Sequence, residues 1–176
     1  MRFKPVPTPP SERSALDDAH RAVPLVPAGE PDCLRRIRER LDVDNETDAR
    51  AWLAFLRALG LAERTARGYG RTDREATPET LREPFRRRVY AAEEALSVLS
   101  SAERPLTAAE IAERIRHCEP TWERRRRVDH ERSWRDRTGR LLDWAVLLDL
   151  AERIEPETRH NNANGERSSY RPKTPR

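Results

Sequence analysis

Apolar residues recur at helical spacing in the first half of the chain. Trp52, Leu56 and Leu59 are four and then three residues apart, so they share one face of a helix. Gly60 follows them, and glycine tolerates the left-handed backbone with which many helices end. The next residues, 61–72, have room for two short strands joined by a turn. The pattern therefore predicts a helix followed by a β-hairpin.

The same pattern occurs again in the second half of the chain. The segment 141–153 aligns with 52–64 without a gap, and both segments end in Leu-Ala-Glu-Arg. Leu148 stands where Leu59 does. Two units of similar pattern favour a tandem architecture. The alternative is two unrelated amphipathic helices in a chain rich in Arg, Leu and Ala.

Shorter helices are predicted before each of these segments. In the first half we expect helices over 11–23 and 32–41, then a polar turn over 42–47 before the longer helix. In the second half, Thr107 and Glu110 have the spacing of a capping box at the start of a short helix. The order helix, turn, helix, hairpin is typical of a helix-turn-helix followed by a wing.

The stretch CLRRIRERLDVDNETDARAWLAFLRALGLAER, followed by GYGRT, resembles the winged helix-turn-helix superfamily. That pattern has a leucine-bearing positioning helix, a turn, a longer recognition helix that ends in Leu-Gly-Leu, and a wing that closes on an aromatic residue. The resemblance covers residues 12–72, and LTAAEIAERI resembles the positioning helix of many winged-helix regulators. The whole chain also resembles a small family of uncharacterised haloarchaeal proteins. The implied fold is mainly α with short β-hairpin wings, as two winged-helix units in tandem.

Composition shifts divide the chain further. Proline-rich sequence at the N-terminus is typical of an extended segment, and Pro78 and Pro84 indicate a linker. One helical stripe begins at Phe85 and is expected to open the second unit. Sequence after Arg153 is either an extended wing, with a tyrosine closing it as in the first unit, or a disordered end; we favour a wing. The expected parts are an extended segment (1–10), a first unit (11–72), a linker (73–84), a second unit (85–172) and a tail (173–176).

The balance of charge permits an acidic partner. Charged residues make up 38% of the chain, the formal net charge is +4, and Lys4 and Lys173 are the only lysines. Arginine favours bidentate contacts with phosphate or carboxylate. A GC-rich genome would produce the same arginine bias without any functional cause.

Two faces are candidates for contact with double-stranded DNA. One is the basic region 124–140 at the second recognition helix; the alternative for it is a solvated face with ion pairs from Glu131 to Arg135 and from Asp136 to Arg140. The other is the first recognition helix with its wing. That helix also carries a small apolar outer face, which suits a protein partner; its residues are Ala51, Ala54 and Ala58. The candidate DNA-binding residues are Arg50, Arg57, Arg67, Arg71, Arg124, Arg125, Arg126, Arg127, Arg135, Arg140 and Arg171.

Little in the sequence indicates catalysis, a metal or a cofactor. There is no Gly-rich phosphate loop and no HExxH motif, and Cys33 and Cys118 have no metal-site spacing. No apolar run has the length of a membrane span and no signal peptide is visible, so we expect a cytoplasmic protein. The histidines are scattered along the chain at His20, His117, His130 and His160.

We therefore predict a DNA-binding protein without enzymatic activity or cofactor, acting as a transcriptional regulator through winged helix-turn-helix units. The alternative is a non-catalytic protein-protein scaffold built on tandem winged helices. The two share a fold, so surface charge decides between them. A homodimer is compatible with the sequence, although no heptad repeat requires one.

Overall fold

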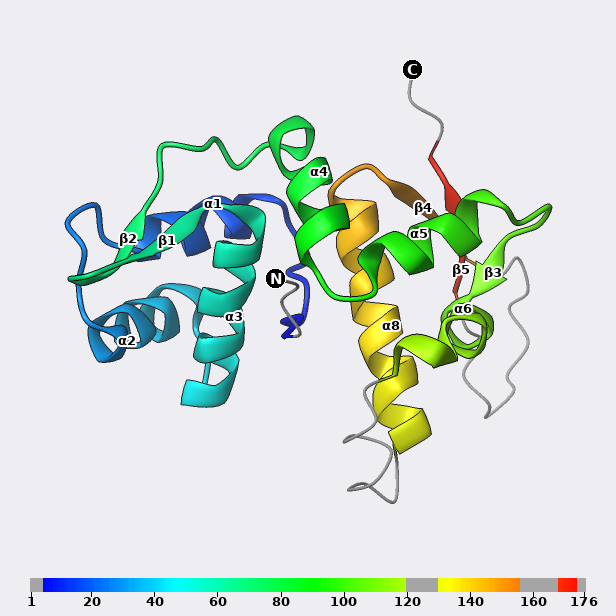
Figure 1. Ribbon diagram of the computed structural model, residues 1–176, viewed down its shortest axis with the longest axis horizontal. Helices are drawn as coiled ribbons and strands as arrows, with labels where there is room; N and C mark the ends of the chain where they lie inside the picture. The colour runs from blue at the N-terminus through cyan, green and yellow to red at the C-terminus, as the bar shows by residue number, and fades with distance from the viewer. Residues whose placement is uncertain (1–4, 120–129, 156–167, 174–176) are drawn as a thin grey trace. The chain divides into compact units, whose positions relative to one another are not determined.

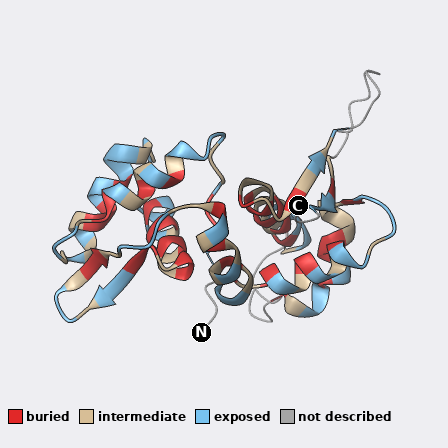
Figure 2. Cartoon of the chain, turned by 90° about the horizontal axis from the view of Figure 1, so that it is seen from above, coloured by how far each residue is buried: buried red, intermediate tan, exposed pale blue. Residues whose placement is uncertain are grey.

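The chain forms two compact units, Met1–Tyr90 and Ala91–Arg176, in a computed structural model that describes residues 5–119, 130–155 and 168–173 (Figure 1). Each unit contains helices followed by a β-hairpin, as the sequence predicted. In each unit the buried positions lie on the inward faces of the helices, and the opposite faces are exposed (Figure 2). This is the amphipathic arrangement that the apolar spacing indicated.

The first unit places three helices before a two-stranded hairpin. Asn45 caps the third helix, because its side-chain oxygen accepts the backbone N–H of Asp48 at 2.8 Å. Pro31 lies in the first turn of the second helix, where its missing N–H has no cost. The elements are α1 (Ser14–Ala22), α2 (Glu30–Leu41), α3 (Glu46–Leu59), β1 (Ala62–Thr65) and β2 (Gly68–Arg71).

A β-bridge joins the segment before α2 to the hairpin. Ala28 exchanges two backbone hydrogen bonds with Tyr69 of β2, at 3.0 and 2.8 Å. Gly68 makes this approach feasible, since a Cβ on it would lie 2.0 Å from the carbonyl oxygen of Ala28. The hairpin of the first unit is therefore fixed to the base of its positioning helix.

The second unit has the same order of elements and a fuller sheet. β5 lies between β3 and β4 and pairs with both in antiparallel fashion, so the strand order is β3-β5-β4. β3 occupies the place that the Ala28 bridge has in the first unit. The elements are α5 (Ala92–Ser100), β3 (Leu106–Thr107), α6 (Ala108–Arg114), the 3-10 helix η1 (Arg116–Cys118), α8 (His130–Leu147), β4 (Ala151–Ile154) and β5 (Ser169–Pro172).

The repeat seen in the sequence extends to the backbone at the end of each recognition helix. Gly60 follows α3 with φ 77°, and Asp149 follows α8 with φ 56°. In both places the next residue, Leu61 or Leu150, donates its N–H to the carbonyl five residues earlier, at 2.9 and 2.8 Å. This is the hydrogen-bond pattern of an α-helix that is terminated by a residue with left-handed φ. The alternative of two unrelated helices is therefore wrong.

Each hairpin also closes on a tyrosine in the same way. Arg64 is opposite Tyr69 in the first hairpin, and Arg153 is opposite Tyr170 in the second. The guanidinium carbons lie 6.0 and 5.9 Å from the ring centroids. Among the described residues, the C-terminal segment therefore contributes a strand, β5, that pairs with β4.

The structure differs from the sequence-based boundaries between the two units. The predicted linker, 73–84, contains the first part of a helix, α4 (Pro78–Arg88), which packs on α3. Phe85 of α4 meets Phe55 of α3 edge-on, with 6.4 Å between ring centroids. Pro78 indicated a linker but stands in the first turn of α4, a position that accepts proline.

The single helix expected from Phe85 onward is broken. α4 ends at Arg88, Val89 is extended, and Ala91 has a left-handed φ of 65° before α5 begins. Val89 and Ala92 are both buried, so the apolar spacing continues across the break. Periodicity alone therefore could not reveal that the first unit ends at Tyr90.

We predict that Leu59→Ala and Leu148→Ala each lower the free energy of unfolding by about 2–5 kcal/mol. The two leucines are equivalent core positions, 0% and 1% exposed. Urea unfolding followed by circular dichroism measures the loss.

Leu25→Ala is the matched control, because Leu25 is 66% exposed and its truncation should change little. A loss below about 1 kcal/mol at either core leucine would contradict the proposed equivalence.

Candidate nucleic-acid interface

α8 is the recognition helix of the second unit, and α6 holds it in place. The indole Nε1 of Trp134 donates to the carbonyl of Ala112 in α6 at 3.0 Å, and Trp134 is buried. α6 begins with the predicted capping box. Glu110 accepts the N–H of Thr107 at 2.8 Å, and the Thr107 hydroxyl accepts the N–H of Glu110 at 3.3 Å.

A second contact reinforces this cap. Arg104 donates to Glu110 at 2.5 Å. The hydrogen bond from Arg104, followed by those from Thr107, lowers the pKa of Glu110 to about 2. The Glu110 carboxylate is thus charged at neutral pH. It stabilises the start of α6, the helix that packs against α8.

A hollow of about 830 Å³ lies among α6, α8 and the start of β5. We call it the α8 groove. Its lining includes small residues of α6 and α8, and its cations come from successive turns of α8. The lining residues are Ala108, Ala109, Arg132, Arg135, Asp136, Gly139, Arg140, Asp143, Ser168 and Tyr170.

Of the two carboxylates that line the α8 groove, Asp143 is engaged in a hydrogen bond and an ion pair with neighbouring residues. Asp143 accepts the hydroxyl of Tyr170 at 2.6 Å and pairs with the guanidinium of Arg153. Burial first, and the Asp143 carboxylate second, raise the pKa of Tyr170, so its hydroxyl remains a donor. Asp136 is exposed and is the remaining acid of the groove.

The ion pairs expected along α8 do not form. Glu131 pairs with Arg116 at 2.9 Å and not with Arg135. Within the described residues, Arg135 and Arg140 have no carboxylate partner. The interpretation of this face as a row of i,i+4 pairs is wrong, because the acid at its start is taken by a residue outside the helix.

Arg132 belongs to the same face. It lies three residues before Arg135 and likewise has no carboxylate partner in the described part of the chain. It lies in the predicted basic region 124–140 but was not among the candidate DNA-binding residues, although its spacing from Arg135 and Arg140 places all three cations along one side of a helix. That spacing was the available signal.

The recognition helix of the first unit has a different surface. Arg50 pairs with Glu30 at 3.0 Å and with Glu46 at 2.6 Å, and this contact with Arg50 lowers the pKa of Glu30. Arg57 lies over the ring of Tyr69, with 5.4 Å between guanidinium carbon and centroid. The charges of α3 are thus satisfied within the unit.

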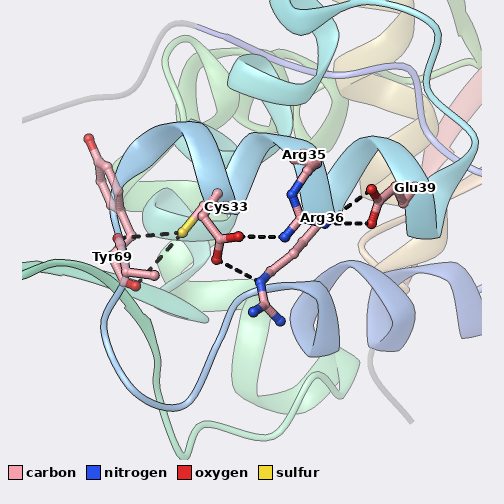
Figure 3. Close-up of polar contacts among 7 residues, drawn as sticks. Cys33, Arg35, Arg36, Glu39 and Tyr69 are labelled. Atoms are coloured by element: carbon pink, nitrogen blue, oxygen red, sulfur yellow. Dashed lines mark hydrogen bonds and ion pairs between the residues drawn. The ribbon is translucent and has the colours of Figure 1, made fainter.

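The neighbouring positioning helix, α2, is neutralised in the same manner. Asp32 accepts from Arg35 at 2.5 Å and from Arg36 at 2.7 Å, and Arg35 reaches Glu39 at 2.9 Å (Figure 3). Cys33, on the same helix, points its thiol at the backbone carbonyl of Tyr69 at 3.8 Å. Burial raises the pKa of that thiol, which is typical of a packed cysteine and not of a reactive one.

The remaining candidate residues fall into three groups. Arg67 and Arg71 lie on the first hairpin, and Arg67 is exposed at its turn. Arg171 pairs with Glu152 across the second hairpin at 2.7 Å. Four others lie outside the described residues; they are Arg124, Arg125, Arg126 and Arg127.

One part of the expected apolar face on α3 is wrong. Ala58 is 0% exposed, because it points into the unit, whereas Ala51 and Ala54 are only partly buried. The outer apolar surface of this helix is therefore smaller than the sequence suggested.

The described residues contain no cluster of three or more metal-ligating side chains. His130 lies 3.0 Å from Glu119, whose side chain is 0% exposed, and this pair ties the start of α8 to the end of η1. No helix in the described ranges is long and apolar enough to cross a membrane.

Comparison with known proteins identifies one family. The family described as the Halobacterial double winged helix domain matches residues 1–165. No curated protein and no solved structure matches the chain.

We predict that Glu110→Gln lowers the stability of the second unit by about 0.5–1 kcal/mol at neutral pH, the usual worth of a helix cap. The folded-state pKa of Glu110 is below its ordinary value of 4.5. Its contribution is therefore fully present above about pH 4.5 and is lost as the pH falls through about 2. Urea unfolding across this range measures the difference between the two proteins.

Glu113→Gln serves as the control on the same helix, because Glu113 makes only an exposed contact of 3.5 Å to Arg116. A Glu110→Gln deficit that is equal at pH 7 and pH 2 would exclude the charge as its cause.

Proposed function

Since the chain belongs to the Halobacterial double winged helix domain family, we propose that it binds double-stranded DNA through the α8 groove and acts in transcriptional regulation. The observation that carries this proposal is the set of arginines in the groove. Arg132, Arg135 and Arg140 have no carboxylate partner within the described residues, while most arginines on α2 and α3 do.

The spacing of these cations suits a duplex. Arg132 and Arg140 are eight residues apart, which corresponds to about 12 Å along an α-helix. This is close to the width of the major groove of B-DNA, about 12 Å. A guanidinium can donate two hydrogen bonds to one phosphate or to the edge of a guanine. The arginine donors of α8 thus extend over a length similar to the width of the DNA major groove.

The acids in the groove are consistent with this role. Asp143 is already neutralised by Arg153 and Tyr170, so it opposes a phosphate weakly. Asp136 remains exposed and can accept a hydrogen bond from the amino group of cytosine. Arg135 and Asp136 therefore offer one donor and one acceptor side by side on the outer face of α8.

A second candidate function, contact with a protein, is favoured by a different observation. Leu25 and Val26 are 66% and 68% exposed, and they are adjacent in a segment fixed to β2 by the hydrogen bond from Arg71 N–H to the Pro24 carbonyl at 2.8 Å. Two neighbouring exposed apolar side chains on a fixed backbone can anchor a partner. This candidate belongs to the first unit and leaves the α8 groove available.

We predict that the wild-type chain binds a random duplex with a Kd of about 10⁻⁴–10⁻⁶ M, and that binding weakens as salt rises. The double variant Arg135→Ala/Arg140→Ala should bind at least roughly tenfold more weakly, with a salt slope smaller by about 2, because two phosphate contacts are lost. Fluorescence anisotropy of a labelled duplex measures both quantities.

The matched control is Arg36→Ala/Arg50→Ala, which removes the same charge from side chains held in ion pairs. Equal weakening by both double variants would assign the effect to net charge and not to the α8 groove. Absence of wild-type binding even at low salt would reject DNA as the partner, and Leu25→Ser/Val26→Ser would then become the variant for tests of protein contact.

A further inference from the structure

Gly139 lies in the middle of α8 and has no evident packing reason to be glycine. Glycine destabilises a helix interior relative to alanine. A Cβ on Gly139 would meet only the Cβ of Ala108 at 3.8 Å, an ordinary van der Waals contact. By contrast, Gly68 excludes a side chain sterically, and Gly60 has a left-handed φ. The space above Gly139 is part of the α8 groove.

The next residue carries a second local cost. The Nε of Arg140 is buried and has no hydrogen-bond acceptor in the described part of the chain. A buried donor without an acceptor is unfavourable and rare in folded proteins. Departures of this kind are expected at functional or strained sites. Two such departures thus occupy consecutive residues of one groove-lining turn.

We infer that the Gly139–Arg140 turn is the point of closest approach for a backbone phosphate of duplex DNA. Gly139 leaves room for the phosphate at the surface of α8, and Arg140, which lines the α8 groove, donates to it through its two terminal nitrogens. The bidentate geometry of arginine matches two oxygens of one phosphate. This inference rests on the proposed function and adds the contact that determines how close α8 comes to the duplex.

The decisive variant is Gly139→Ala, because it should change stability and binding in opposite directions. The added methyl group makes only an ordinary contact with Ala108 and improves the helix, so the midpoint of thermal unfolding of the second unit should rise by about 4–8 °C. The same methyl group occupies the space of the phosphate, so the Kd for a random duplex should rise roughly tenfold, the equivalent of one lost charge-assisted hydrogen bond.

Two further variants separate this contact from general effects. Ser97→Ala on the exposed side of α5 should also favour its helix while leaving DNA affinity unchanged. Arg140→Lys keeps the charge but removes the fork, so it should weaken binding to a similar extent as Gly139→Ala. Both changes act on one phosphate contact. The Kd of the double variant Gly139→Ala/Arg140→Lys should therefore be no higher than the higher of the two single-variant Kd values.

The outcomes distinguish this inference from the proposed function. A stabilised Gly139→Ala protein that binds DNA like the wild type would overturn the close approach while DNA binding stands. Additive losses in the double variant would overturn the shared phosphate. A wild type that does not bind DNA would overturn both proposals. Thermal stabilisation by inorganic phosphate that Gly139→Ala abolishes, with DNA affinity unchanged, would assign the turn to a free anion instead.

Discussion

Each unit depends on the left-handed residue that ends its recognition helix. Gly60 and Asp149 reverse the chain so that the following N–H bonds back to the helix and the first wing strand begins. The strand then meets its partner in a fixed register, which places an arginine opposite the closing tyrosine. Without this reversal, the wing would not lie beside the recognition helix, and the α8 groove would lose the part of its lining that Ser168 and Tyr170 supply.

The sequence predicted those parts of the fold that depend on local signals. The apolar spacing on α3 and α8, the glycine after α3 and the capping box of α6 all act within a few residues, and the structure has each of them. The break between α4 and α5 could not be predicted, because Val89 and Ala92 keep the helical apolar spacing while the backbone between them departs from it. β3 is only two residues long and is determined by its pairing with β5, which is distant in sequence.

In the candidate site, too, some features depend on local sequence and others on contacts between residues distant in sequence. Arg135 and Arg140 could be named from the sequence because they lie on a predicted helix. Within residues 5–119, 130–155 and 168–173 these two arginines have no carboxylate partner, and this could not be predicted, since Glu131 pairs with Arg116, fifteen residues earlier. The neutralised face of the first unit depends equally on a contact between helices, the pair of Arg50 with Glu30. Charge along one helix is readable from sequence, but whether that charge is available to a partner is decided by tertiary contacts.

The alignment of the two recognition helices gives this difference a residue-level basis. With Leu59 equivalent to Leu148, Glu46 of α3 corresponds to Arg135 of α8, and Arg50 corresponds to Gly139. The Glu46–Arg50 ion pair of the first unit is thus replaced by an arginine that has no carboxylate partner among the described residues and by an open space. Core positions are conserved between the units because they maintain one fold, whereas these surface positions have opposite character. Helices α2 and α3 hold most of their arginines in ion pairs, whereas Arg132, Arg135 and Arg140 of α8 have no carboxylate partner in the described part of the chain and are available to a partner that carries the acceptors.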